Sequence, residues 1–216
     1  MEDNKDSEER NYHHGDLKTA LVDVARKMLE ESGPEAISFR EIARQVGVSR
    51  TAPYNHFQSK EHLLATVAAG GFQEFLDYNC GVSEGVENPE ERIVVLMEGY
   101  VEFALKHPQL YRLMFGVGIA DWHDYPEVKL KAKAAYEPIT QAIVQHYQNN
   151  GVNNEEAVET AAVTVWSTFH GFVMLVLDGK LNPSYYSAET TQALAKRLSK
   201  WFIAGLDAGF EDLQKT

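Results

Sequence analysis

The sequence predicts an all-helical protein, and three observations support that fold class. Apolar residues recur at three- and four-residue spacing along most of the chain, which is the period of an α-helix. Glycine and proline are sparse inside these periodic segments and gather between them. Counting the segments gives about nine helices, enough for a small three-helix head and a larger helical body.

The clearest local signal lies in residues 38–57, which predict two short helices joined by a tight turn. Ser38 and Glu41 have the spacing of a capping box, in which each side chain satisfies a backbone amide of the other. Gly47 stands where the first helix should end, because glycine adopts the left-handed conformation without steric cost.

Ser49 can then cap a second helix over residues 50–56. Pro53 is compatible with that helix because it falls in the first turn, whose amides have no intrahelical partner. Two short helices around a glycine-containing turn describe a helix-turn-helix, which places its second helix in the major groove of DNA.

Residues 13–64, and above all the segment GVSRTAPYNHFQSKEHLL at 47–64, resemble the DNA-binding domain of TetR-family regulators. Further along, Trp166 with His170 and Gly171 is similar to the C-terminal domain of the TetR subgroup named after those three residues. The resemblance implies a DNA-binding head followed by a helical ligand-binding and dimerisation body.

The predicted domain plan has a flexible acidic N-terminus at 1–14, a head at 15–75 containing the motif at 38–57, and a body at 80–216. The first helix is expected to begin at Asp16. A linking helix, capped by Ser59, is expected from Lys60 to near Tyr78, and it contains Gly70 and Gly71. Further helix starts are expected at Asn88-Pro89 and at Pro108. This glycine pair has two interpretations, a hinge or a point where another helix packs closely.

The net charge of −12 is unevenly distributed. Residues 1–9 carry −4, residues 10–62 carry +1 and residues 63–216 carry −9. The predicted head is therefore the least acidic part of the chain without being basic. We expect affinity for DNA to come from a few placed cations and from dimer geometry, because a broad positive field is absent.

Chemistry assigns the base contacts to the start of the second motif helix. Arg50 suits guanine O6 and N7, and the methyl groups of Thr51 and Ala52 suit a thymine methyl. Asn55 can pair with adenine or reach a phosphate. Taken alone, Arg50 and Lys60 would each be interpreted as a solvated cation, Tyr54 as a core aromatic and His56 as a surface residue. Together in this spacing, these residues favour DNA contact.

Phosphate contacts follow from the resemblance, which places Tyr54 and His56 at family positions that bind the DNA backbone. Lys60 begins the linking helix, where helix-end amides also attract phosphate. The expected DNA-contacting residues are Ser38, Arg40, Ser49, Arg50, Thr51, Ala52, Tyr54, Asn55, His56 and Lys60.

Residues 160–177 are uncharged and approach the length of a membrane span. Thr164, Ser167, Thr168 and His170 interrupt the stretch, and glutamates precede it, so a buried helix in a dimer bundle is favoured. Together with a last helix over 188–210, it predicts an interface that is self-complementary about a two-fold axis.

The body should enclose a mostly apolar effector pocket. His170 is interpreted either as a buried structural histidine or as an effector contact. The expected lining residues are Met97, Tyr100, Phe103, Met114, Phe115, Trp122, Trp166, Phe169, His170 and Met174.

Enzyme and metal motifs are missing from the sequence. A single cysteine, Cys80, excludes thiolate-rich zinc sites and an internal disulfide, and no HExxH, P-loop, nucleophile elbow or dinucleotide fingerprint occurs. We therefore predict no catalytic residue, no metal and no cofactor. The segments 13–16 and 121–124, which contain histidine and aspartate, are weak metal-binding alternatives whose ligands lie too close along the chain for a closed tetrahedral site. With no secretory signal pattern, a cytoplasmic location is expected.

The function hypothesis is a homodimeric repressor that binds a palindromic DNA operator and is released by a small, largely apolar effector. One alternative is a dimeric small-molecule-binding helical module without DNA binding. Another is a helical enzyme using His123 or His170, for which the sequence offers no recognisable catalytic constellation.

Overall fold

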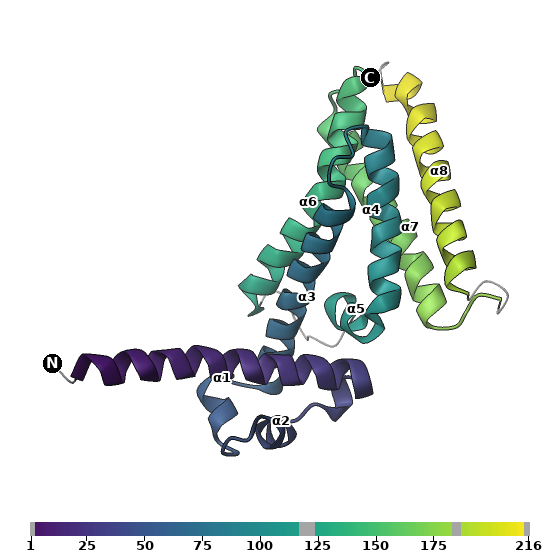
Figure 1. The fold of residues 1–216 in the computed structure, drawn as a ribbon. Coiled ribbons are helices and arrows are strands. Elements are labelled where there is room, and N and C mark those ends of the chain that lie inside the picture. Colours follow the sequence, from purple (N-terminus) through teal and green to yellow (C-terminus); the bar gives the residue numbers. More distant parts are fainter. Residues whose placement is uncertain (1–2, 117–123, 183–186, 214–216) are drawn as a thin grey trace. The chain divides into compact units, whose positions relative to one another are not determined.

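The computed structural model describes the backbone of residues 3–116, 124–182 and 187–213, and side chains from residue 17 onward except residues 188 and 209–213. In these ranges the protein is helical, as predicted (Figure 1). The α-helices are α1 (Asp3–Ser32), α2 (Phe39–Val46), α3 (Lys60–Val82), α4 (Pro89–Lys106), α5 (Pro108–Phe115), α6 (Pro126–Asn149), α7 (Glu155–Leu177) and α8 (Ala188–Leu213), with two 3-10 helices, η1 (Pro34–Ala36) and η2 (Ala52–Asn55).

The expected number of about nine helices is wrong by one, because the described residues form eight α-helices. The missing helix is the second helix of the motif, which is the 3-10 helix η2 instead. The helix starts expected from proline and asparagine signals are confirmed at α4 and α5.

The expected start of the first helix at Asp16 is also wrong, because α1 begins at Asp3. Residues 3–14 contain neither glycine nor proline, and their glutamates, lysine and arginine have good helix propensity. Acidic residues also favour the positive end of the helix dipole. Gly15 costs about 1 kcal/mol and does not stop the helix.

The chain divides into two compact units. Unit 1 contains residues up to Phe72 together with 107–131, and unit 2 contains 73–106 and 132 onward. Helix α3 contributes residues to both units, and so does α6. The domain boundaries proposed from the sequence stay a prediction.

Unit 1 is built around α1, which packs against α2 and α5. Leu21, Ala25 and Leu29 of α1 are fully buried, on the apolar stripe that its sequence predicts. Ile42 of α2 and Phe57 join this core. The three-helix packing fixes α2 and the segment that follows it.

Helix α5 also packs closely against α3 at Gly71. A Cβ atom on Gly71 would lie 2.8 Å from Leu110 Cδ1 and 2.9 Å from Met114 Sδ, whereas one on Gly70 would meet nothing within 4 Å. The ring of Phe72 contacts that of Phe115 edge-on, with centroids 5.3 Å apart. The structure therefore favours close helix packing, the second interpretation of the glycine pair, at Gly71.

Gly70→Ala and Gly71→Ala form a matched pair of substitutions. We expect Gly70→Ala to raise the free energy of unfolding by about 1 kcal/mol, because alanine is the better helix former. Gly71→Ala gains the same helix propensity, but its methyl group crowds Leu110 and Met114. Such overpacking lowers the free energy of unfolding by about 1–3 kcal/mol. Urea denaturation should rank Gly70→Ala above Gly71→Ala, and equal stability would contradict the packing role.

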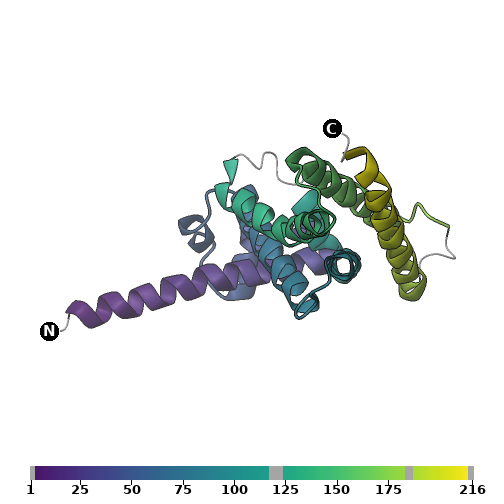
Figure 2. The same cartoon turned by 90° about the horizontal axis from the view of Figure 1, so that it is seen from above.

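In unit 2, α4 packs against α7 and α8, and α7 packs against α8 (Figures 1 and 2). Leu96 and Val101 of α4 are buried together with Val165 and Phe169 of α7. Within the described chain, α7 alone is long and apolar enough to cross a membrane, with a mean hydropathy of 1.6. Only 33% of this span is buried in the protein, where α7 packs against α4 and α8.

Candidate nucleic-acid interface and effector region

The N-terminus of α2 is capped by Ser38, whose Oγ accepts a hydrogen bond from the Glu41 amide at 3.3 Å. Glu41 does not form the reciprocal half of the predicted capping box, in which its carboxylate would accept a hydrogen bond from the Ser38 amide. Its carboxylate accepts two hydrogen bonds from Arg44, at 2.6 and 2.9 Å, and one from Gln45 at 3.0 Å. A charged guanidinium is a stronger partner for a carboxylate than a neutral amide, which explains the difference.

This pairing changes the acidity of Glu41. Hydrogen bonds from Arg44, and then from Gln45, lower the pKa of Glu41 from 4.5 to about 2. The Glu41–Arg44 ion pair on α2 therefore stays charged at any pH at which the protein would bind DNA.

Gly47 ends α2 as predicted. Its φ and ψ of 80° and 28° are left-handed, and the amides of Gly47 and Val48 both donate to the Ala43 carbonyl, at 3.0 and 2.9 Å. The turn at Gly47 changes the direction of the chain, which then enters the segment predicted to contact DNA bases.

That segment is not the α-helix predicted over 50–56. It is a single 3-10 turn, η2, in which the Tyr54 amide donates to the Thr51 carbonyl at 3.1 Å and the His56 amide to the Pro53 carbonyl at 3.0 Å. Pro53 has no amide to donate and disfavours the α-conformation of the residue before it, so i to i+3 bonds replace the α-helical ladder. The predicted Ser49 cap is also wrong, because Ser49 Oγ lies 3.1 Å from Thr51 Oγ1 instead.

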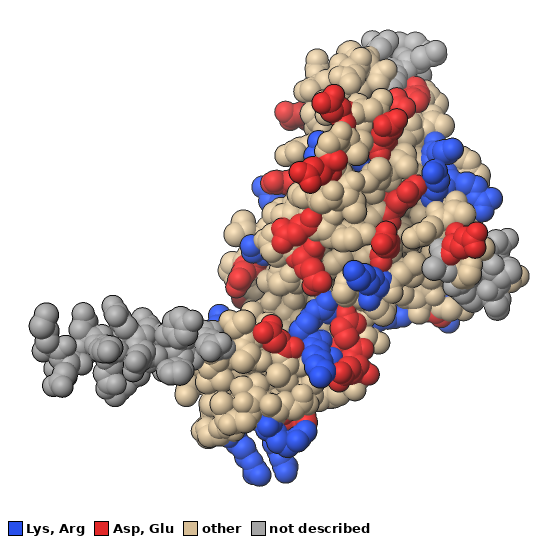
Figure 3. Space-filling view, viewed as in Figure 1, with Lys and Arg blue, Asp and Glu red and all other residues tan. Residues whose placement is uncertain are grey.

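The predicted DNA-contacting side chains nevertheless reach the surface of unit 1. Arg40, Arg50, Thr51, Tyr54, Asn55, Ser38 and Ser49 are exposed, and Ala52, His56 and Lys60 are half-buried. Figure 3 shows basic side chains gathered at the end of unit 1 where α2 lies.

Tyr54 is the most informative of these residues. It is 64% exposed, while its ring packs edge-on against the buried Phe39 with centroids 4.9 Å apart. A core aromatic would hide its hydroxyl, so the structure excludes that interpretation of Tyr54. Phe57, which follows η2, is buried. Ser59 caps α3 as predicted, accepting from the His62 amide at 3.2 Å.

The predicted effector residues are divided between the two units. Met114 and Phe115 pack inside unit 1, where Phe115 contacts Phe72 and Tyr111, and Trp122 lies outside the described residues. Sequence cannot separate pocket from core here, because both use apolar side chains on amphipathic helices. The remaining predicted residues, all in unit 2, are Met97, Tyr100, Phe103, Trp166, Phe169, His170 and Met174.

Some of these meet in an aromatic cluster that joins several helices. Tyr100 Oη lies 3.5 Å from His170 Nδ1, and the Trp166 and His170 ring centroids are 6.2 Å apart. The cluster also takes in Phe75, 5.5 Å from Tyr100, and Tyr136, 6.1 Å from Trp166. Met97, Phe103 and Phe169 are buried nearby in the core of unit 2.

Phe75 and Tyr136 are therefore members that the sequence-based list lacks. The Tyr136 hydroxyl is buried and makes no hydrogen bond within the described structure. Burial, and then the charge of Glu159, raises the pKa of Tyr136 to about 12. The cluster thus offers an apolar surface with a few polar atoms, which is the chemistry of a small-molecule site.

Comparison with known proteins identifies the class of molecule. Residues 21–67 match the family model for bacterial regulatory proteins of the tetR family, and residues 93–198 match the model for the tetracyclin repressor-like C-terminal domain. The two models together span both units. The chain belongs to the TetR family.

Several known proteins are similar to this chain over most of its length. An uncharacterized HTH-type transcriptional regulator, Rv0681 from Mycobacterium tuberculosis, is 26% identical over 76% of this chain and 72% of its own. A solved protein of unknown function from Rhodococcus sp. RHA1 is 28% identical, with a TM-score of 0.76 over 90% of this chain and 97% of its own. The transcriptional regulator FadR from Bacillus subtilis, solved with stearoyl-CoA, shares the fold at 14% identity and a TM-score of 0.69, over 87% of this chain and 98% of its own.

This TetR-family protein is therefore a transcriptional regulator, with a DNA-binding N-terminal domain and a ligand-binding C-terminal domain. The family and its relatives are regulators and not enzymes. The individual DNA and effector contacts named above remain predictions.

The half-buried imidazole of His170 leads to a pH prediction. Burial lowers the pKa of His170 below 6.5, so the folded protein binds this proton less readily than the unfolded chain. The folded state therefore has its full stability above pH 6.5, where His170 is neutral in both states. Below pH 6.5 the unfolded chain takes up the proton first, and stability is lost as the pH falls through the folded pKa. NMR titration of the ring should give a midpoint below 6.5, and wild type should lose melting temperature relative to His170→Gln over that window. A midpoint at or above 6.5 would contradict the burial of His170.

Proposed function

We propose that this TetR-family regulator is a homodimeric repressor that binds a palindromic operator and is released by a small, largely apolar effector. The observation that carries the proposal is that Arg50 and Tyr54 are exposed next to and within η2, with the Tyr54 ring packed against Phe39 of α2. Arginine and tyrosine there can supply one base contact and one phosphate contact per protomer.

The dimer is proposed to form through α7 and α8. Val163 and Leu175 of α7 and Trp201 of α8 are large apolar side chains exposed to solvent. A groove of about 910 Å³ lies between the two helices, and Trp201, Phe202 and other mostly uncharged residues line it. An exposed apolar face of this kind supports an interface, and a two-fold axis would pair it with the same face of a second copy.

The effector is proposed to contact the aromatic cluster of Tyr100, Tyr136, Trp166 and His170. Aromatic faces suit an apolar ligand body, and the Tyr136 hydroxyl can bond one polar group of that ligand. FadR, which shares the fold, was solved with stearoyl-CoA, an amphiphile with a long apolar chain. The pattern of Trp166, His170 and Gly171 supports placement in the TetR subgroup named after those residues.

Release from DNA requires an effector that binds more tightly to a conformer in which the spacing of the two DNA-binding domains does not match the operator half-sites. The effector can shift this equilibrium only by its difference in affinity between the two states. Helix α3 is the proposed lever, because it contributes residues to both units. A cytoplasmic location follows from a role on chromosomal DNA.

The test is selection of bound genomic fragments by the full-length protein, followed by footprinting and titration at several salt concentrations. We expect a two-fold symmetric footprint and an affinity that falls steeply with salt, because phosphate contacts release counterions. Protection without symmetry would exclude the dimer on a palindrome. Absence of any salt-dependent binding would favour the alternative, a dimeric small-molecule-binding module without DNA binding.

A further inference from the structure

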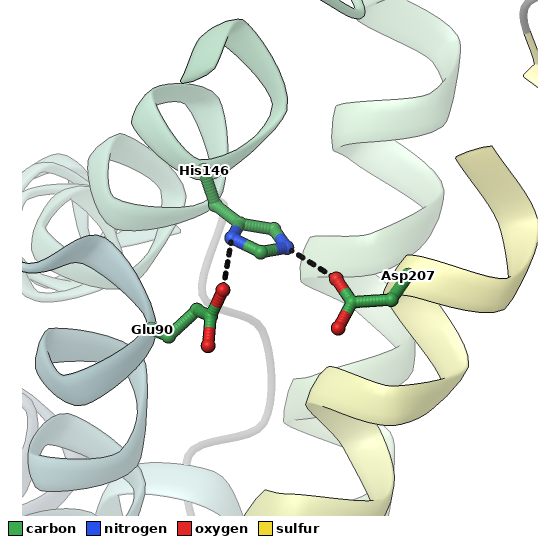
Figure 4. A group of neighbouring side chains, drawn as sticks. All are labelled: Glu90, His146 and Asp207. Atoms are coloured by element: carbon green, nitrogen blue, oxygen red, sulfur yellow. Dashed lines mark hydrogen bonds and ion pairs between the residues drawn. The ribbon is translucent and has the colours of Figure 1, made fainter. Parts of the chain in front are cut away.

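Three helices of unit 2 bring a histidine and two carboxylates together, His146 from α6, Glu90 from α4 and Asp207 from α8 (Figure 4). His146 Nε2 lies 3.1 Å from Asp207 Oδ1, and His146 Nδ1 lies 3.7 Å from Glu90 Oε1. One donor atom from each residue lies within 4.8 Å of the other two. The His146 side chain is 1% exposed, whereas those of Glu90 and Asp207 are 51% and 49% exposed.

The donor atoms suit a first-row divalent cation. Imidazole nitrogen and carboxylate oxygen are both common ligands of Zn²⁺, with bonds of about 2.0–2.2 Å. Two such ligands of a tetrahedral ion are about 3.3 Å apart, close to the 3.1 Å between His146 Nε2 and Asp207 Oδ1. The distance between these two atoms therefore fits a cation bound to both of them.

Glu90 lies on the opposite side of the imidazole, near Nδ1. A histidine that binds metal through one ring nitrogen usually donates its other N–H to a carboxylate, which fixes the tautomer and the ring orientation. Glu90 is placed for this positioning role. The His146 ring, being buried, has little freedom to leave the arrangement.

A hydrated ion can reach the cluster from solvent. Glu90 and Asp207 line an open groove of about 550 Å³ between α4 and α8, together with Glu91 and Glu98. Lys196 and Lys200 line the same groove, so four carboxylates face two ammonium groups and the groove is net negative. This balance attracts cations.

We propose that His146 Nε2 and Asp207 bind a divalent cation of the Zn²⁺ class, with Glu90 orienting the imidazole and water completing the coordination. The cation would connect α6 to α8, and through Glu90 to α4, in the ligand-binding domain.

The test is calorimetric titration of the full-length protein with ZnCl₂, with thermal denaturation in saturating Zn²⁺ and again after EDTA. We expect Asp207→Asn to weaken Zn²⁺ binding at least about tenfold and Glu90→Gln by about 10–100-fold. Zn²⁺ should raise the melting temperature of wild type by about 3 °C or more, and EDTA should reverse the shift.

Glu91→Gln is the matched control. Glu91 lies beside Glu90 in the first turn of α4 and lines the same groove, but it is not part of the three-residue cluster. Its affinity for Zn²⁺ should stay within about twofold of wild type. Both test positions are half exposed and the substitutions are isosteric, so circular dichroism should show folded variants.

Three results would overturn the proposal. No heat and no thermal shift with Zn²⁺ would show that the cluster is an ion-paired histidine only. Equal binding by wild type, Asp207→Asn and Glu90→Gln would place the ion elsewhere, for example at Cys80. If Glu91→Gln and Glu90→Gln lost equal affinity for Zn²⁺, the binding would depend on the overall negative charge of the groove and not on the three-residue cluster.

Discussion

Trp201→Glu is expected to convert the protein into a monomer that binds operator at least about 100-fold more weakly. Trp201 is 72% exposed and lines the groove between α7 and α8. In a two-fold interface the substitution would place a carboxylate on both copies, and burying an unpaired charge is costly. Each protomer would then bind a half-site without the contribution of its partner.

Sedimentation velocity measures the first effect, since wild type should sediment near twice the chain mass of 24.3 kDa and the variant near 24.3 kDa. Leu130→Glu is the control, because Leu130 is also a large apolar side chain, 66% exposed, but lies on α6. It should leave both the mass and operator affinity unchanged. A dimeric Trp201→Glu variant, or a monomeric Leu130→Glu variant, would contradict the proposed interface.

Arg50→Ala is expected to weaken operator binding by about 10–100-fold while leaving the melting temperature unchanged. Arg50 is exposed next to η2, and a bidentate arginine–guanine pair contributes about 1–3 kcal/mol of discrimination. The loss should therefore be largest on the cognate sequence and should relax specificity at one base pair. Fluorescence anisotropy with the selected operator and with single-base variants measures both effects.

Lys27→Ala is the control for the loss of one positive charge. Lys27 lies on α1 of the same unit with its side chain 69% exposed, and its partner is Glu31. Its removal should change operator affinity by less than about twofold. Arg50→Ala that binds like wild type, or that weakens all sequences equally, would argue against base recognition by Arg50.

Where the sequence contains local signals, it predicts the fold well. Ser38, Gly47 and Ser59 cap or end helices as expected, because capping depends on residues a few positions apart. The helix starts at Pro89 and Pro108 are confirmed for the same reason.

Competition between local signals explains the failures in the motif. Arg44 takes the Glu41 carboxylate away from the capping box, and Pro53 replaces a predicted α-helix by a 3-10 turn. Helix α1 runs back to Asp3 because no residue before Gly15 opposes it.

Sites assembled from distant segments could not be predicted. Glu90, His146 and Asp207 stand on three separate helices, and no spacing along the chain reveals that they meet. Tyr136 joins Trp166 and His170 only through helix packing, so a list built from apolar patterns lacks it. Met114 and Phe115 pack in unit 1, and their predicted role in the effector pocket stays a prediction.

The shortness of η2 has a consequence for how DNA recognition responds to temperature. A lone 3-10 turn has too few internal hydrogen bonds to persist by itself, so its shape is imposed by the side chains beneath it, Phe57 and the Phe39–Tyr54 contact. When these apolar contacts loosen, η2 and its DNA-contacting side chains become disordered while the α-helices stay folded. On warming, sequence discrimination should therefore fade some degrees before the bulk of the helical signal disappears.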